Sequence, residues 1–143
     1  MSEEFLIGGF TSTMKKGRIA GYGIYVTNKR IIGIKAWKRF VVGATIGAIL
    51  GGAAVGALLG RALTKDESRK LIEELDKKKD FEAYKEDISY IELKKPSFWR
   101  RGHLLVAMKS GESIKVLMAE KGDYERLLTL LREFYPEALR LVG

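Results

Sequence analysis

The chain of 143 residues is long enough for one domain with a buried core, and its 26 Lys and Arg against 18 Asp and Glu give a net charge of +8. It has no cysteine, which excludes disulfides and thiolate chemistry. The acidic start Met1-Ser-Glu-Glu lacks the basic-then-apolar order of a signal peptide. Gln is absent and Asn occurs once, while Lys, Glu and Arg are plentiful, a composition that leans towards a thermophile.

The positive charge is concentrated before residue 40. There, eight Lys and Arg meet only Glu3 and Glu4, a net charge of +6, whereas the remaining 18 basic and 16 acidic residues leave +2. A basic N-terminal part indicates an anionic partner, either lipid head groups or nucleic acid. The aromatic residues do not alternate with basic ones as a base-stacking surface requires. A lipid or protein partner is therefore expected rather than nucleic acid.

The first part of the chain has the pattern of three β-strands. Residues 4–13 (EFLIGGFTST) are apolar and β-prone, and residues 14–18 (MKKGR) are expected to form a basic turn after them. Residues 20–27 and 30–36 are two further strands on either side of Asn28-Lys29. Because Asn tolerates a positive φ angle, these two residues are expected to make a tight hairpin turn.

Residues 41–60 (VVGATIGAILGGAAVGALLG) contain no charge, and with Phe40 they match the ~20 residues that cross a bilayer as a helix. Their glycines recur at spacing four in two sets, the small-xxx-small pattern that lets helices approach closely. On an unbroken helix the two sets lie on nearly opposite sides, which favours a ring or bundle over an isolated span. The expected helix-packing glycines are Gly43, Gly47, Gly51, Gly52, Gly56 and Gly60.

A charged helix is expected over residues 65–79. Thr64 and Glu67 have the spacing of a capping box at its start. The helix has a single apolar stripe, made of Leu71, Ile72 and Leu75. Residues 80–87 are polar and are expected to be a link rather than a regular element.

The last part of the chain predicts three more strands and a helix. Residues 88–93 (ISYIEL) are expected to form a strand, but their alternation does not decide which face of it is buried. Residues 103–109 and 113–119 are expected to form a hairpin around Ser110-Gly111. Residues 123–134 carry apolar side chains at spacings of three and four, which predicts an amphipathic helix that Pro136 ends. Six strands followed by such a helix indicate an antiparallel sheet closed by a helix.

With these elements placed, the chain resembles GRAM-type and bacterial pleckstrin-homology-like domains. Such domains begin with an acidic-apolar strand, a variable loop and a strand pair that reads roughly Tyr-x-Thr-Asn/Ser-Lys-Arg-apolar-apolar, here residues 25–32 (YVTNKRII). The strand at 88–93, the late hairpin and the last helix are similar to the second half of the family pattern. The resemblance implies a small bent sheet whose loops bind lipid, peptide or another subunit, and it does not imply catalysis.

The expected fold class is therefore α+β. One domain over residues 1–143 would be a pleckstrin-homology-like bent antiparallel sheet or barrel capped by the C-terminal helix. Residues 40–87 have no counterpart in the family pattern and are expected to be an inserted helical hairpin. Its two arms would be the glycine-rich helix and the charged helix over residues 65–79.

The insert has several possible arrangements. If strands on both sides of it build one domain, both of its ends must emerge in the same compartment, which a single crossing forbids. The charged helix cannot return through the bilayer, because inserting each Lys, Arg or Asp at the bilayer centre costs about 2.5–3.5 kcal/mol. A re-entrant dip bent at Gly51-Gly52, a seam between subunits and an internal core helix remain open. A single span remains only if the one-domain interpretation is wrong.

Two groups of residues are candidates for contact with an anionic membrane. Aromatic rings beside cations suit a membrane interface, as in Phe98, Trp99, Arg100 and Arg101, although the Trp side chain could instead pack under the sheet. The second group consists of basic residues in the first turn, for which a solvated basic turn is the simpler interpretation, and of basic residues around the insert. The candidate residues for lipid or phosphate binding are Lys15, Lys16, Arg18, Lys38, Arg39 and Arg61.

The sequence contains no nucleophile–base pair, phosphate-binding glycine loop or metal-ligand spacing, so no enzyme activity, cofactor or metal is expected. His103, the single histidine, is expected to be structural. We expect a non-catalytic binding module on the cytoplasmic face of the cell membrane, with lipid, its own copies or another protein as partner. The alternative is a soluble homo-oligomeric scaffold with the glycine-rich helices packed at its centre.

Overall fold

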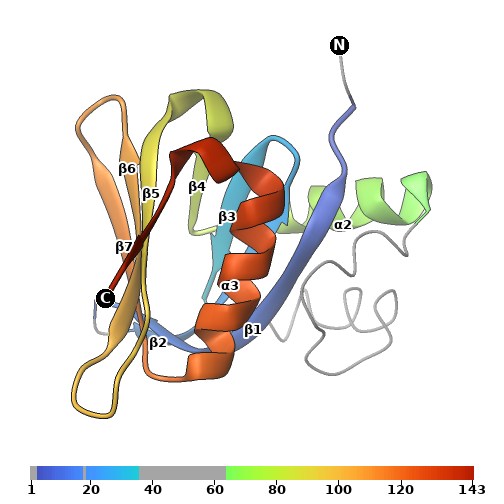
Figure 1. Ribbon diagram of the computed structural model, residues 1–143. Helices are drawn as coiled ribbons and strands as arrows, with labels where there is room; N and C mark the ends of the chain where they lie inside the picture. Colours follow the sequence, from blue (N-terminus) through green and yellow to red (C-terminus); the bar gives the residue numbers. More distant parts are fainter. Residues whose placement is uncertain (1–2, 18, 36–63) are drawn as a thin grey trace.

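The computed structural model describes residues 3–17, 19–35 and 64–143 (Figure 1). Eight strands form one sheet, and two α-helices are present in this described part of the chain: α2 (Lys65–Lys78) and α3 (Lys121–Phe134). The strands are β1 (Leu6–Lys16), β2 (Ile19–Thr27), β3 (Arg30–Ile34), β4 (Phe81–Tyr84), β5 (Ile88–Lys94), β6 (Gly102–Met108), β7 (Ser113–Met118) and β8 (Leu139–Val142). Short 3-10 turns, η3 (Lys85–Asp87) and η4 (Pro136–Ala138), precede β5 and β8.

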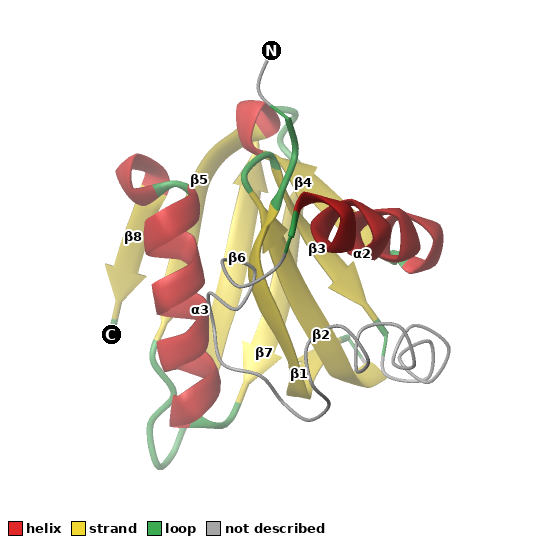
Figure 2. Cartoon of the chain, turned by 90° about the vertical axis from the view of Figure 1, so that its right-hand side faces the viewer, coloured by secondary structure: helices red, strands yellow, loops and turns green. Residues whose placement is uncertain are grey.

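The sheet has the strand order β4-β3-β2-β1-β7-β6-β5-β8. Its two halves meet where Lys15 of β1 pairs with Leu117 of β7. All neighbouring strands are antiparallel except β5 and β8, which run parallel. Helix α3 lies along one side of the sheet, and α2 lies beside β3, away from α3 (Figure 2).

The larger core lies between the sheet and α3. Leu127, Leu130 and Leu131 of α3 are fully buried and join side chains from both halves of the sheet, such as Ile24 and Val106. The periodicity of α3 places these residues on one face, because positions three and four apart along a helix are neighbours. Helix α3 therefore holds the two halves of the sheet in one unit.

A second, smaller core lies on the opposite face of β1–β3, beneath α2. Successive side chains of a strand point to opposite faces, so Ile31 enters the larger core while Ile32 packs in the smaller one. Leu71 and Leu75, both from the predicted apolar stripe, cover Ile32. Every residue of β3 is buried, since one face of the strand belongs to the larger core and the other packs against α2.

Strands from both sides of residues 36–63 pair with each other. Ile31 and Ile32 of β3 lie opposite Ala83 and Glu82 of β4, in antiparallel register. The Phe81 ring packs directly on Gly33: a Cβ there would lie 2.0 Å from a ring atom, so the ring would have to move. The chain on either side of residues 36–63 is thus part of one sheet.

Several predicted elements are confirmed. Helix α2 begins with a complete capping box, in which Thr64 accepts from the Glu67 amide and the Glu67 side chain accepts from the Thr64 amide. The hairpin between β6 and β7 turns at Gly111, whose φ of +96° is costly for residues other than glycine. Helix α3 begins two residues before the predicted start and ends at Phe134, where the sequence pattern ends it.

The expected fold class, an α+β fold with a pleckstrin-homology-like antiparallel sheet and an inserted helical hairpin, is wrong. The described chain is mostly β, with one large mixed sheet and two helices. The sheet is mixed because β8 adds to β5 in parallel. The predicted glycine-rich arm at 41–60 lies outside the described residues, so α2 is one helix and no hairpin is shown.

Two strands were missed. The predicted polar link contains β4, an edge strand of four residues defined by its backbone pairing with β3 rather than by apolar alternation. Strand β8 is equally short and largely exposed, and its pairing with β5 depends on where α3 returns the chain. Within residues 3–17, 19–35 and 64–143, no helix combines the length and the apolar character needed to cross a bilayer.

Candidate functional site

The connection between β5 and β6 presents two aromatic side chains to solvent. Phe98 is 91% exposed and Trp99 is 87% exposed, the highest values among the large apolar residues that are exposed in the described chain. Their rings meet edge to face, with centroids 4.9 Å apart. The Ser97 amide donates to the Arg100 carbonyl at 2.8 Å, which closes the turn that carries both rings. The predicted alternative, with Trp99 tucked under the sheet, is wrong.

Close backbone packing sets the position of this connection. Gly102, the first residue of β6, is buried against the end of β5. A Cβ at this position would lie 2.1 Å from the Lys94 carbonyl oxygen and 2.6 Å from the Pro96 nitrogen. Only glycine lets the two backbones come this close, so residue 102 determines how the aromatic turn leaves the sheet.

Strand pairing brings other segments to the same end of the sheet. Gly102 pairs with Met118, and His103 pairs with Leu117, which in turn pairs with Lys15 of β1. The prediction of a basic turn over residues 14–18 is wrong at its start, because Lys15 and Lys16 are the last residues of β1. They therefore lie on the same side of the molecule as the β5–β6 connection. A small surface hollow lined by Ser97–Arg101 and Ala119 joins the turn to the start of the β7–α3 connection.

Strand β8 adds two exposed aliphatic residues. It runs parallel to β5, so Leu141 lies beside Leu93 and Val142 beside Lys94. The Lys95 amide donates to the Val142 carbonyl at 3.4 Å. Four of the five large exposed apolar side chains of the described chain, all but Phe5, thus lie towards one end.

We call this surface the basic–aromatic end. Its cationic side chains form no ion pair with a described residue, although the Lys16 ammonium lies 5.8 Å from the Phe81 ring centroid. Glu92, nearby on β5, forms a hydrogen bond with His103, with 2.6 Å between Glu92 Oε2 and His103 Nε2. The basic–aromatic end consists of Lys15, Lys16, Lys94, Lys95, Phe98, Trp99, Arg100, Arg101, Leu141 and Val142.

The structure thus brings together two of the predicted groups. The aromatic connector and the pair Lys15 and Lys16 share one end of the sheet. The remaining predicted residues lie outside the described part of the chain: Arg18, Lys38, Arg39, Arg61 and the six glycines Gly43, Gly47, Gly51, Gly52, Gly56 and Gly60. Sequence reasoning missed Lys94 and Lys95, although they directly precede the connector, and it missed Leu141 and Val142, which only the pairing of β8 places there.

The residues of the family-like signature have structural roles. Asn28 Oδ1 accepts from the Phe5 amide at 2.8 Å, and the Asn28 side chain donates to the Glu3 carbonyl at 3.0 Å. Thr27 Oγ1 accepts from the amides of Lys29 and Arg30, both at 3.0 Å. These bonds close the β2–β3 turn and attach the N-terminal segment to it, so the signature builds the scaffold.

Arg30 is the most connected of the signature residues. Its side chain is 5% exposed and forms ion pairs with Glu4 at 3.0 Å, Asp76 at 2.8 Å and Glu82 at 2.6 Å. Burial alone would lower the pKa of Arg30, but the hydrogen bonds to these three carboxylates raise it above its ordinary value. Hydrogen bonds from Lys79 and Arg30 lower the pKa of the Asp76 carboxyl. Both shifts favour the charged forms, so Arg30 and Asp76 stay ionised at neutral pH.

No family model, curated protein or solved structure matches this chain. Within the part of the chain that the structure describes, His, Asp and Glu side chains form no group of three that could hold a metal ion. The candidate function therefore depends on the exposed surfaces and hollows of the described residues.

Proposed function

We propose that this protein is a non-catalytic module that binds an anionic membrane surface through its basic–aromatic end. The observation that carries the proposal is the pair Phe98 and Trp99, almost fully exposed on a turn between Lys94, Lys95 and Arg100, Arg101. Exposed aromatic rings flanked by cations match the composition of membrane interfaces, where the rings enter the head-group level and the cations meet lipid phosphates. The proposed location is the cytoplasmic face of the cell membrane.

The aromatic rings supply the apolar part of the binding energy. Large aromatic side chains bury roughly 150–250 Å² each, and apolar area contributes about 25 cal/mol per Å². Burying half of each ring of Phe98 and Trp99 would therefore contribute about 2 kcal/mol per residue. The edge-to-face contact between the rings presents them as one wedge, which supports joint insertion.

The cations supply the electrostatic part. Each Lys or Arg near an anionic leaflet contributes about 1 kcal/mol, and the effect falls off within a Debye length. Six such side chains belong to the basic–aromatic end, and none is neutralised by a described carboxylate. Their shared location favours one defined orientation on the membrane.

The strand pairing across residues 36–63 also supports surface binding. Strand β3 precedes this segment and β4 follows it, and the two strands are neighbours in the sheet. Both flanks therefore stay on the same side of any membrane that the protein meets. This arrangement agrees with attachment from one face and not with a single crossing between β3 and β4.

Vesicle co-sedimentation tests the proposal. The full chain is mixed with phosphatidylcholine vesicles that contain or lack phosphatidylglycerol. We expect binding to the anionic vesicles, strong loss of binding in the Phe98→Ser/Trp99→Ser variant, and a blue shift of Trp fluorescence in the wild type on binding that this variant lacks.

Removing Arg100 and Arg101 (Arg100→Gln/Arg101→Gln) should also weaken binding to the anionic vesicles, and its matched control removes two charges elsewhere. Arg69 and Lys70 are exposed on α2, away from the basic–aromatic end, so Arg69→Gln/Lys70→Gln should bind vesicles as the wild type does. Equal binding to neutral and anionic vesicles, or unchanged binding of the aromatic variant, contradicts the proposal. Light scattering on the detergent-free protein tests the alternative function. A stable oligomer that does not bind vesicles would favour the homo-oligomeric scaffold.

A further inference from the structure

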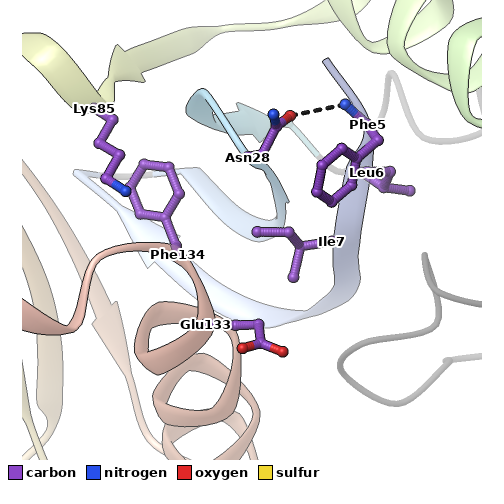
Figure 3. Close-up of a pocket in the computed structure, with 7 residues that line it drawn as sticks. All are labelled: Phe5, Leu6, Ile7, Asn28, Lys85, Glu133 and Phe134. Atoms are coloured by element: carbon purple, nitrogen blue, oxygen red, sulfur yellow. Dashed lines mark hydrogen bonds between the residues drawn. The ribbon is translucent and has the colours of Figure 1, made fainter. Parts of the chain in front are cut away.

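A pocket of about 390 Å³ opens at the end of the sheet that carries the β2–β3 turn, away from the basic–aromatic end. Figure 3 shows Phe5 and Ile7 of the first strand segment on one side and Phe134 at the end of α3 on the other. Lys85 reaches the pocket beside Phe134, and Glu133 lies at its α3 side. This volume is within the range of small-molecule sites, roughly 300–1,000 Å³.

The pocket has an apolar wall. Phe5 is 53% exposed although it is aromatic, and its ring faces the space in front of Phe134 (Figure 3). Ile7 and Phe134 belong to the larger core, so the bottom of the pocket is continuous with packed apolar side chains. A hydrocarbon group placed here would cover Phe5 and rest on this surface.

A second hollow of about 560 Å³ adjoins the pocket and is basic. The two hollows share Asn28 and Lys85, and the second adds Lys29, Lys109 and Tyr135 to its lining. The Lys85 ammonium lies 4.9 Å from the Tyr135 ring centroid and 5.9 Å from that of Phe134. Lys85 therefore stands at the junction of the apolar and the basic parts.

The charges of the two hollows favour one negative charge on a ligand. Lys29, Lys85 and Lys109 form no ion pair with any residue that the structure describes. Against these three lysines stand Glu86, which lines the basic hollow, and Glu133, which lines the apolar pocket and already has a partner interaction. Over the two linings together the excess is a single positive charge, and all three lysines line the basic hollow.

Backbone hydrogen bonds hold the lining in place. The Asn28 amide donates to the Phe5 carbonyl at 3.1 Å, and the Lys85 amide donates to the Lys29 carbonyl at 2.8 Å. The Lys109 amide donates to the Asp87 carbonyl at 2.8 Å. The segments that carry the lysines and Phe5 are thus fixed to one another without a ligand, as preorganised binding requires.

From this juxtaposition we propose that the two hollows form one site for a small amphipathic monoanion, a medium-chain aliphatic carboxylate. Its hydrocarbon chain lies between Phe5 and Phe134, and its carboxylate lies among Lys29, Lys85 and Lys109. The lysine ammonium groups donate hydrogen bonds to the carboxylate oxygens. The hydrocarbon chain of the ligand leaves water and packs against the apolar wall, which favours binding. The site is separate from the basic–aromatic end and does not depend on membrane binding.

The test uses the full ¹⁵N-labelled chain and three probes in NMR titrations. Decanoate, below its micellar concentration, has both the carboxylate and the chain; decanol has the chain alone; acetate has the carboxylate alone. We expect saturable decanoate shifts at the amides of Phe5, Asn28, Lys85 and Tyr135, with decanol and acetate at least about tenfold weaker. Equal binding of either single-feature probe, shifts confined to residues 97–101, or no saturable shift overturns the proposal.

Variants test the assignment of each part. Lys85→Gln should weaken decanoate binding by about tenfold or more, and Phe5→Ser should weaken it while leaving the backbone bonds of residue 5 in place. Lys115 is an exposed lysine of β7 without a described ion pair, so Lys115→Gln is the matched control and should bind decanoate normally. The Phe98→Ser/Trp99→Ser variant should also bind it normally, which separates this site from the proposed membrane surface. Normal binding by Lys85→Gln contradicts the proposal.

Discussion

The Arg30 guanidinium donates to the Glu82 carboxylate at 2.6 Å and so joins β3 to β4 across residues 36–63. The same guanidinium nitrogen donates to Asp76 of α2 at 2.8 Å, and Nε of Arg30 donates to Glu4 at 3.0 Å. One buried cation thus links β3 to the N-terminal segment and to the consecutive elements α2 and β4. Its planar donors can serve several carboxylates at once, which a lysine ammonium could not match in geometry.

Replacement of Arg30 by Met should destabilise the protein. Removing one partner of a buried ion pair costs about 3–5 kcal/mol because it leaves uncompensated charge. Here the carboxylates are 22–48% exposed and can recover part of their hydration. We therefore expect a loss of about 2–3 kcal/mol in the free energy of unfolding, or a melting temperature lower by roughly 5–10 °C. Thermal and urea unfolding followed by circular dichroism measure it.

Arg69→Met is the control for this experiment. Arg69 also pairs with an aspartate, Asp66 at 2.9 Å, but both side chains are largely exposed on α2. Exposed pairs of this kind contribute about 0–1 kcal/mol. If Arg30→Met is no more destabilising than Arg69→Met, the buried cluster does not hold the segments together.

Asp76 should make the protein sensitive to acid. Its pKa is lower in the folded state than the 3.8 of a free side chain, because Lys79 and Arg30 donate to its carboxylate. The unfolded chain therefore binds the proton at higher pH, and the stabilisation is complete above about pH 5 and is lost as the pH falls through the folded pKa. Asp76→Asn should lower the free energy of unfolding at neutral pH and flatten its decline below about pH 5. Parallel curves for the variant and the wild type would show that Asp76 contributes nothing.

The helices and the two hairpins could be predicted because their signals are local. Leu127 and Leu131 recur at helical spacing, and the capping residue Thr64 stands directly before the stripe of α2. Strands β4 and β8 could not be predicted this way, because an edge strand needs only backbone pairing on one side. The mixed sheet therefore differs from the expected antiparallel one at the strands whose partners are distant in sequence.

Only part of the basic–aromatic end could be predicted from the sequence, namely the part with a local signal. Phe98 and Trp99 stand out because they lie beside arginines in a connector between Pro96 and Gly102. The contribution of Val142 to the same end depends on its pairing with Lys94, which no local pattern encodes. The sequence distinguishes Arg30 only as part of a family-like signature, because its carboxylate partners are 26 to 52 positions away.

Gly102→Ala should displace the aromatic turn. The added Cβ would meet the Lys94 carbonyl and the Pro96 nitrogen, both backbone atoms that cannot rotate away. We expect destabilisation of about 1–3 kcal/mol and weaker vesicle binding than in the wild type, with faster amide exchange at residues 97–101. Gly122→Ala is the control, because a Cβ at residue 122 comes no closer than 3.4 Å to Arg126. Vesicle binding that Gly102→Ala leaves unchanged would show that the turn geometry does not matter for it.

Salt should separate the two contributions to membrane binding. Raising the ionic strength from about 0.05 M to about 0.5 M shortens the Debye length severalfold, so the attraction between Arg100, Arg101 and the lipids weakens, whereas burial of Phe98 and Trp99 does not. Arg100→Gln/Arg101→Gln should therefore bind anionic vesicles roughly 30-fold more weakly at low salt, for a loss of about 2 kcal/mol, and show a shallower salt dependence. The Phe98→Ser/Trp99→Ser variant should keep the steep salt dependence of the wild type at lower overall affinity, because its cations are intact. Co-sedimentation across this range measures both slopes, and identical slopes for the two variants would mean that the rings and the arginines do not act as separate apolar and electrostatic anchors.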